Sequence, residues 1–238
     1  MKKRAGKENQ KAGPVSAVIL AAGSSSRMQG RDKLAAVLGG ESVIRRSLRA
    51  FQDCALVDEI VVVLRRGGEQ PVLAACEGLD KVRRIVQGGD SRTVSACRGV
   101  MAADKTARII LIHDGARPLV SDAVIRAVIA GAETYGAAVP VVPVTDTIKT
   151  GADGFVTGTP DRADLFAAQT PQGFRAELIK AALSDAVAKN LTLTDDCAAV
   201  ERLGMRVRLV AGDSRNRKLT TPEDLTLAAA LLGEEATV

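Results

Sequence analysis

The chain contains few of the residues that carry several common chemistries. Among 238 residues there are one histidine, one tyrosine, four phenylalanines, four cysteines and no tryptophan. Stacking platforms for nucleotide bases need aromatic side chains, so nucleic-acid binding is disfavoured. The cysteines are widely spaced and form no Cys-x-x-Cys pair, which argues against a zinc site. We therefore expect packed, reduced thiols and no nucleic-acid partner.

Long apolar runs are also missing, and we expect no secretory leader. No apolar stretch approaches the ~18 residues that a membrane-spanning helix requires, and polar residues separate the basic start from the first apolar run. We expect a cytoplasmic protein with no membrane partner. Of the net charge of +5, most lies in residues 1–13, which hold five basic residues against one acidic residue. We expect a disordered basic tail there, followed by one domain over residues 14–238.

Apolar runs alternate with amphipathic segments along this domain. Apolar runs predict strands at residues 18–22, 59–64 and 108–112, and further short strands are predicted at residues 82–86 and 207–210. Helical spacing predicts helices over residues 41–54, 72–79, 93–103, 121–135, 175–189, 194–203 and from 221. Such alternation is what a parallel sheet covered on both faces requires. The expected fold is α/β, Rossmann-like and doubly wound, with a mostly parallel sheet.

Two segments depart from this alternation. Residues 137–144 are extended, but Pro140 and Pro143 predict an edge strand or an irregular one. Residues 146–162, rich in Thr, Gly and Asp, predict a β-hairpin outside the sheet, within an excursion at about 144–165. An isolated hairpin cannot bury itself and needs a partner surface. We expect this projecting arm to form a homodimer, although a solvated hairpin is the alternative.

A strand that ends in a small, basic loop opens the domain. The run 18–22 is followed by Gly23, three serines and the cations Arg27, Arg31 and Lys33. Small residues let backbone N–H groups approach a phosphate, so the loop favours triphosphate binding. Neither the P-loop pattern nor the dinucleotide fingerprint is present, which disfavours an NAD-dependent dehydrogenase. An ordinary loop with a solvated basic rim remains the alternative.

Polar loops follow two further strands. Residues 87–92 read Gln-Gly-Gly-Asp-Ser-Arg, and residues 113–118 read His-Asp-Gly-Ala-Arg-Pro. In open α/β sheets, ligands bind at the carboxyl ends of the strands. We therefore expect the loops after Ala22, Val86 and Ile112 to converge on one crevice.

Read together, these segments resemble one family. They are Ala21-Ala22-Gly23, Gly88-Gly89-Asp90-Ser91-Arg92, His113-Asp114-Gly115-Ala116-Arg117-Pro118, Gln169-Thr170-Pro171-Gln172 and Thr194-Asp195-Asp196. In this order they are similar to the 2-C-methyl-D-erythritol 4-phosphate cytidylyltransferases of non-mevalonate isoprenoid biosynthesis, from about Val15 to Leu232. The resemblance implies transfer of a cytidylyl group from CTP to a polyol phosphate, with release of pyrophosphate. It also implies Mg²⁺ or another divalent cation as cofactor.

The resemblance assigns roles to individual residues. The expected catalytic residues are Arg27 and Lys33, which stabilise the transition state at the α-phosphate, and Arg162 and Lys218, which hold the attacking phosphate. The expected nucleotide contacts are Leu20, Ala21, Ala22, Gly23, Gly89, Asp90, Ser95, Asp114 and Gly115. The expected substrate contacts are Arg117, Thr147, Arg162, Thr170 and Lys218. Asp114 is the expected metal ligand, and the arm would carry Thr147 and Arg162 into the partner's site.

The attacking group makes a general base unnecessary. A phosphate monoester is already deprotonated near neutral pH, so His113 is expected to shape its loop instead of accepting a proton.

Departures from the family pattern leave alternatives open. Serines replace a glycine in the opening loop, and Asp32 stands beside Lys33, where a carboxylate can pair with the lysine. A cytidylyltransferase for a pentitol phosphate such as ribitol 5-phosphate is one alternative, and a non-catalytic nucleotide-binding module is the other.

Overall fold

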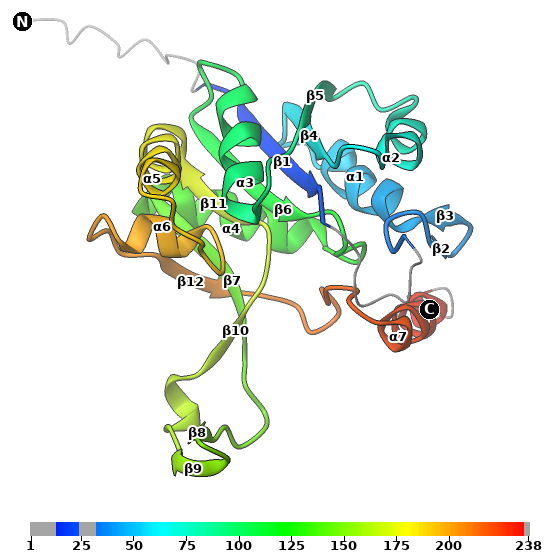
Figure 1. Cartoon of the computed structure of the whole chain (residues 1–238). Coiled ribbons are helices and arrows are strands. Elements are labelled where there is room, and N and C mark those ends of the chain that lie inside the picture. The colour runs from blue at the N-terminus through cyan, green and yellow to red at the C-terminus, as the bar shows by residue number, and fades with distance from the viewer. Residues whose placement is uncertain (1–12, 24–31, 236–238) are drawn as a thin grey trace, which may run out of the picture.

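The computed structural model describes residues 13–23 and 32–235 (Figure 1). The expectations for the basic tail, for Ser24 to Ser26 and for Arg27 therefore fall almost entirely outside the described residues. Within the described ranges, no helix is long and apolar enough to cross a membrane. The four cysteines carry free thiols, as expected.

The core is an eight-stranded sheet. Its main path runs β10 (Phe166–Ala168), β7 (Ala137–Pro143), β11 (Gln172–Arg175), β6 (Ile109–Asp114), β1 (Val15–Ala21), β4 (Glu59–Leu64) and β5 (Val82–Gln87), and β12 (Arg208–Ala211) also pairs with β7. β1 pairs in parallel with both β4 and β6, while β10 and β11 run antiparallel to β7. The prediction of a mostly parallel α/β sheet is confirmed.

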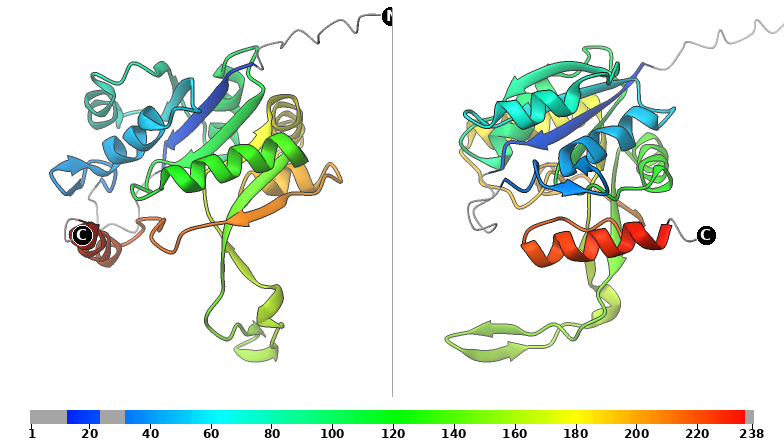
Figure 2. Two further views of the ribbon diagram at one scale, coloured as in Figure 1. Left: turned by 180° about the vertical axis from the view of Figure 1, so that it is seen from behind. Right: turned by 90° about the vertical axis from the view of Figure 1, so that its right-hand side faces the viewer.

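Helices cover both faces of this sheet. They are α1 (Val43–Asp53), α2 (Glu69–Cys76), α3 (Arg92–Ala102), α4 (Asp122–Tyr135), α5 (Ala176–Ala188), α6 (Cys197–Glu201) and α7 (Pro222–Glu235). Alternate residues of β1 point to opposite faces: Ala17 and Ile19 join a core with α1, α2 and α4, whereas Val18 joins a core with α3, α5 and α6. Figure 2 shows α1 and α4 together on one side of the sheet. The arrangement is doubly wound.

The edge-strand prediction for residues 137–144 was wrong. β7 pairs with β12 over residues 138–141. It also pairs with β11 at residues 137–138 and with β10 at residues 141–143. Pro140 lies opposite Gln169, whose N–H donates to the Pro140 carbonyl at 2.8 Å, in the break between β10 and β11. Pro140 has no N–H to donate in return, and it lies at this break, where the ladder is already interrupted.

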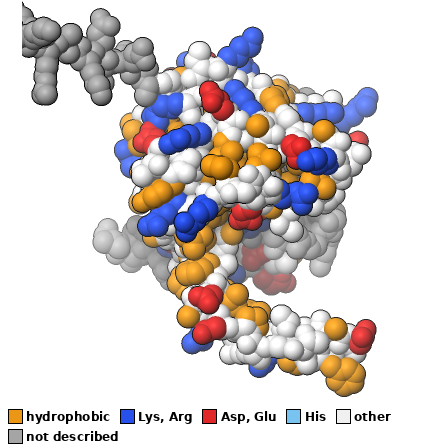
Figure 3. Space-filling view, turned by 90° about the vertical axis from the view of Figure 1, so that its left-hand side faces the viewer, with side chains coloured by type: hydrophobic (Ala, Val, Ile, Leu, Met, Phe, Trp, Pro, Cys, Tyr) orange, Lys and Arg blue, Asp and Glu red, His pale blue; other side chains and the backbone are white. Residues whose placement is uncertain are grey.

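Two short hairpins complete the fold. The predicted excursion contains β8 (Thr150–Ala152) and β9 (Phe155–Gly158), which pair antiparallel and project from the body as an arm (Figure 1). Phe155 and Val156 on this arm are 78% and 66% exposed. Figure 3 shows apolar side chains along the arm and at its far end. A second hairpin, β2 (Val37–Leu38) and β3 (Glu41–Ser42), precedes α1 and lies near α7.

Candidate active site

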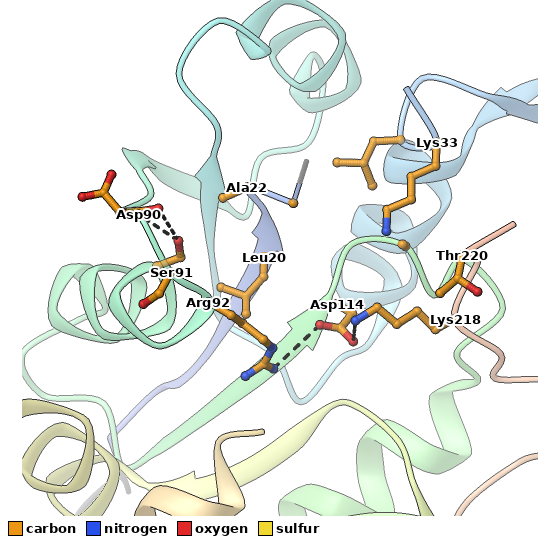
Figure 4. Close-up of a pocket in the computed structure, with 14 residues that line it drawn as sticks. Leu20, Ala22, Lys33, Asp90, Ser91, Arg92, Asp114, Lys218 and Thr220 are labelled. Carbon is orange, nitrogen blue, oxygen red and sulfur yellow. Dashed lines mark hydrogen bonds and ion pairs between the residues drawn. The ribbon is translucent and has the colours of Figure 1, made fainter. Parts of the chain in front are cut away.

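A cavity of about 380 Å³ opens where β1 and β6 end (Figure 4). Five segments line it: the end of β1, the turn before β2, the loop before α3 with the first turn of that helix, the loop after β6 and the connection between β12 and α7. The lining residues are Leu20, Ala22, Gly23, Lys33, Leu34, Gly89, Asp90, Ser91, Arg92, Ser95, Asp114, Ala116, Lys218 and Thr220. The predicted convergence of three strand-end loops is thus found at the carboxyl ends of the parallel strands.

Two glycines bring backbone close to the floor of the cavity. A Cβ atom on Gly88 would lie 2.7 Å from the Ala22 Cβ and 2.8 Å from the Ser95 Oγ, so only glycine fits there without a shift. The N–H of Gly89 donates to the Ser95 Oγ at 3.1 Å. The Ser91 Oγ accepts from the N–H of Val94 and caps α3, whose positive end faces the cavity. This loop offers backbone groups and a helix N-terminus to a nucleotide.

Asp114 lies at the centre of three cations. Its Oδ2 is 2.9 Å from Lys218 Nζ and 3.7 Å from Arg117 Nε, and its Oδ1 is 3.7 Å from Arg92 Nη2. Burial alone would raise the pKa of Asp114, but the charges of Lys218, Arg92 and Arg117 outweigh burial and hold this pKa below its ordinary value. Asp114 is therefore ionised under all ordinary conditions.

Arg92 is anchored from behind by a buried carboxylate. Asp196, whose side chain is 1% exposed, accepts two hydrogen bonds from the guanidinium at 3.0 and 2.8 Å. Gln172 Oε1 accepts from the N–H groups of Asp196 and Cys197, which fixes the turn that presents this carboxylate. Burial lowers the pKa of Arg92, but Asp196 and Asp114 more than compensate and raise it. The guanidinium remains charged beside Asp114.

His113 is buried beneath the cavity and takes part in a hydrogen-bond chain. The N–H of Asp114 donates to the Thr170 Oγ1 at 3.1 Å, and the Thr170 Oγ1 lies 3.0 Å from His113 Nδ1. His113 Nε2 lies 3.2 Å from the Arg117 carbonyl oxygen. These partners assign a neutral ring that accepts at Nδ1 and donates from Nε2. The ring shapes the loop after β6, as the sequence suggested.

Lys33 reaches the cavity from a turn that Asp32 stabilises. The Asp32 Oδ1 accepts from the N–H of Leu34 at 3.0 Å, and its carbonyl accepts from Ala35 and Ala36. Asp32 therefore uses its carboxylate to close the turn. Figure 4 shows the Lys33 side chain extending toward the side of the cavity that holds Asp114 and Lys218.

The predicted site residues fall into four groups. Nine line the cavity: Leu20, Ala22, Gly23, Lys33, Gly89, Asp90, Ser95, Asp114 and Lys218. Four others, Ala21, Gly115, Arg117 and Thr170, lie in the surrounding body, where the Thr170 hydroxyl and the Arg117 guanidinium serve internal contacts. Thr147 and Arg162 belong to the arm segment and are not among the described residues that line the cavity, and Arg27 lies outside the described residues.

Sequence reasoning missed five residues that line the cavity: Leu34, Ser91, Arg92, Ala116 and Thr220. Ser91 and Arg92 were detectable, because a hydroxyl after Gly-Gly-Asp is a helix N-cap signal and the next residue then starts the first turn at the predicted site. Thr220 lies next to the predicted start of the last helix, but nothing in the sequence pattern indicated that it would face the cavity.

Comparison with known proteins decides the family. The family model described as 2-C-methyl-D-erythritol 4-phosphate cytidylyltransferase matches residues 15–234. The chain belongs to this family. The cytidylyltransferase of Symbiobacterium thermophilum is 45% identical over 225 residues, which cover 94% of each chain. The one of Geobacter metallireducens is 43% identical over 229 residues, 93% of this chain and 98% of the relative.

Solved structures of cytidylyltransferases of this family share the fold. The 4-diphosphocytidyl-2C-methyl-D-erythritol synthase of Anaerococcus prevotii superposes with a TM-score of 0.84 at 31% identity, covering 93% of this chain and 99% of that one. The 2-C-methyl-D-erythritol 4-phosphate cytidylyltransferase of Thermus thermophilus gives 0.77 at 36% identity, covering 92% and 98%. The family resemblance read from the sequence is confirmed over nearly the whole chain.

A cytidylyltransferase cavity has to accommodate a triphosphate and its counterions. In the described ranges, no three His, Cys, Asp or Glu side chains gather into a preformed metal site. Asp90 and Asp114 are the carboxylates among the described residues that line the cavity. This donor set is poor for a permanently held ion. It suits a magnesium ion that shares one carboxylate with phosphate oxygens.

Proposed function

We propose that this chain transfers the cytidylyl group of CTP to 2-C-methyl-D-erythritol 4-phosphate, in non-mevalonate isoprenoid biosynthesis in the cytoplasm. Residues 14–238 act as one catalytic domain. An oxygen of the phosphate monoester bonds to the α-phosphorus of CTP, and the bond from this phosphorus to the oxygen bridging to the β-phosphate breaks. Pyrophosphate leaves with the bonding electrons. The monoester is deprotonated near neutral pH, so no side chain has to remove a proton.

One observation carries the proposal: Lys33 and Lys218, which are distant in sequence, line the same cavity as the glycine loop before α3. The reaction brings together two anions, so charge is its main obstacle. Preorganised cations lower that obstacle most when they point to where charge develops in the transition state. We assign this role to Lys33, and to Arg27 by its place in the family motif.

The nucleotide and the polyol phosphate occupy different sides of the cavity in this proposal. The cytidine side comprises the end of β1 and the loop before α3, with Ala22, Gly89 and Ser95. The phosphate of the polyol meets Lys218, which is held at 2.9 Å from Asp114 and can exchange this carboxylate for the incoming phosphate. Arg92 keeps Asp114 in place from the opposite side.

A divalent cation fits this arrangement as a companion of CTP. Asp114 lines the cavity and stays ionised, and Mg²⁺ typically takes one or two carboxylates together with phosphate oxygens. We propose Asp114 as the ligand that holds Mg²⁺ or another divalent cation. When bound, the ion supplies positive charge to the triphosphate oxygens.

The arm is proposed to complete the site of a second chain. Thr147 is exposed, and Arg162 donates from Nη1 to the Thr145 carbonyl at 2.7 Å at the base of the arm. A two-stranded hairpin is only marginally stable alone, and exposed Phe155 and Val156 supply apolar surface for a partner. We propose a homodimer in which each arm offers Thr147 and Arg162 to the partner's cavity.

The deciding experiment follows pyrophosphate release from CTP and Mg²⁺ with 2-C-methyl-D-erythritol 4-phosphate or with ribitol 5-phosphate. We expect turnover with the first substrate and far less with the second. Equal or faster turnover of ribitol 5-phosphate would identify a pentitol phosphate enzyme instead. Binding of CTP without pyrophosphate release from either substrate would favour the non-catalytic module.

A pair of variants tests whether the cavity is the active site. Lys33→Ala is expected to lower kcat by about a hundredfold or more, because it removes a cation from the transition state. Lys105→Ala, an exposed lysine remote from the cavity, is the matched control and should leave kcat unchanged. Comparable kcat values for both variants would place the reaction elsewhere.

A further inference from the structure

The segment that carries Lys218 has no regular structure of its own. Residues 212–221 connect β12 to α7 without forming a helix or strand. The position of the Lys218 ammonium group therefore depends on contacts that this connection makes with the body. Backbone bonds hold its two ends, where the Gly212 N–H donates to the Val141 carbonyl at 2.9 Å and the Leu219 N–H to the Ala116 carbonyl at 2.8 Å. Between them, two buried amides hold the connection: Gln169, 5% exposed, and Asn216, 0% exposed. Neither is among the described residues that line the cavity.

Gln169 holds the start of the connection with both ends of its amide. Its Nε2 donates to the Asp213 carbonyl at 2.8 Å, and its Oε1 accepts from the Asp213 N–H at 3.2 Å. The same Oε1 accepts from Asn216 Nδ2 at 3.3 Å. The Gln169 side chain thereby bonds both backbone groups of Asp213, as the backbone of a neighbouring strand would.

Asn216 ties the middle of the connection to the same place. Asn216 lies two residues before Lys218 along the chain, and its Nδ2 donates to the Thr170 carbonyl at 2.8 Å. Its Oδ1 is buried and has no hydrogen-bond partner among the described residues, so the side chain acts as a donor. The Asn216 carbonyl accepts from Arg117 Nη1 at 2.7 Å, which adds a link to the loop after β6.

The two ends of the Lys218–Asp114 ion pair are therefore fixed by adjacent residues. Thr170 accepts from the N–H of Asp114 at 3.1 Å, while Gln169 and the Thr170 carbonyl hold the segment of Lys218. We infer that Gln169 and Asn216 are positioning residues that set where the Lys218 ammonium group meets the phosphate of the polyol substrate. This inference rests on the proposed function, which makes Lys218 the group that holds that phosphate.

The test measures steady-state kinetics of Asn216→Ala and of Gln169→Met, which conserves length and volume but makes no hydrogen bonds. Each variant lacks hydrogen bonds that hold the segment of Lys218 in place. For both variants, kcat/KM for the polyol phosphate should therefore fall about tenfold, the equivalent of about 1.4 kcal/mol. KM for CTP should change less than about twofold. Ser214→Ala, an exposed residue of the same segment, is the matched control and should match the wild type.

A double-mutant cycle separates positioning from general destabilisation. If Asn216 acts through Lys218, adding Asn216→Ala to Lys218→Met should cause little further loss of kcat/KM. Multiplied losses in the double variant would overturn the inference, and so would an unchanged kcat/KM in Gln169→Met. If Asn216→Ala does not fold, the Gln169→Met cycle with Lys218→Met decides by the same criteria. A wild type with no turnover would instead refute the proposed function, so the two failures are distinct.

Discussion

The histidine beneath the cavity gives the sharpest test of the site's electrostatics. His113 is fully buried, its ring centroid is 4.9 Å from that of Phe51, and both ring nitrogens have partners. Its pKa is lowered from an ordinary 6.5 to about 4, mainly by burial; the Asp114 charge opposes this shift and the Arg117 charge adds to it. We predict that the ring remains neutral in the folded protein throughout the physiological range.

This shift links folding stability to pH with a definite sign. Between pH 6.5 and pH 4 the unfolded chain binds a proton on the ring, whereas the folded protein does not. Stability is therefore greatest above pH 6.5 and decreases as the pH falls toward 4. The slope is about 1.4 kcal/mol per pH unit, which amounts to about 3 kcal/mol over the window. For a chain of this size, that corresponds to a Tm lowered by roughly 6–12 °C.

The chain offers an unusually clean assay because it contains one histidine. The ring proton signals in an NMR spectrum need no assignment among several histidines, so their titration reports His113 directly. Urea unfolding of the wild type and of His113→Asn, measured at half-unit steps from pH 7 to pH 4.5, gives the stability. Carboxylates such as Asp196 titrate in both proteins, so their contribution cancels in the difference between the two curves.

The reasoning fails on either of two results. Ring signals that titrate near pH 6.5 in the folded protein would show that burial does not hold the ring neutral. Equal pH slopes for the wild type and His113→Asn would show that His113 does not link stability to pH.

Three further predictions concern the cavity, the arm and the buried ion pair. Gly88→Ala should raise KM for CTP at least about tenfold, because the new methyl would meet the Ser95 Oγ at 2.8 Å; unchanged CTP binding by calorimetry would contradict this. Phe155→Asp should shift the sedimentation equilibrium of the proposed dimer toward monomer, and a dimer that persists would exclude this surface. Asp196→Asn should lower the unfolding free energy by about 3 kcal/mol, because it leaves its arginine partner half-buried and poorly paired. Asp185→Asn, in an exposed pair, should cost under about 1 kcal/mol, and similar urea midpoints for the two variants would contradict the assignment.

Periodicity and composition were sufficient for the body of the fold. The apolar run at residues 59–64 is buried at every position in β4, which is why it could be read as a strand without any alternation. The error at β7 has a local cause. The rule that proline marks an edge strand assumes an unbroken neighbour, and the neighbour of Pro140 is interrupted between β10 and β11.

The site was harder to predict, because a sequence motif does not show which way each of its side chains points. Asp114 and Lys218 line the cavity as expected, whereas Thr170, from an equally distinctive motif, turns its hydroxyl toward His113. The pairing of Arg92 with Asp196 joins residues separated by about a hundred positions. α3 packs against α5, and α5 packs against α6. This tertiary packing brings the two side chains together, and no local pattern reports such a contact.

The number of residues in the arm determines how far its tip lies from the body. Its two stems continue β7 and β10, which pair in fixed register up to Phe166 opposite Pro143, and the Val144 N–H then donates to the Leu165 carbonyl at 3.2 Å. Adding one residue to each stem would advance the tip by about 3.3 Å. Adding one residue to a single stem would instead turn its following side chains to the opposite face. Natural variation in the length of the arm should therefore come in matched pairs, and in the proposed homodimer a longer or shorter arm would change the spacing between the two copies.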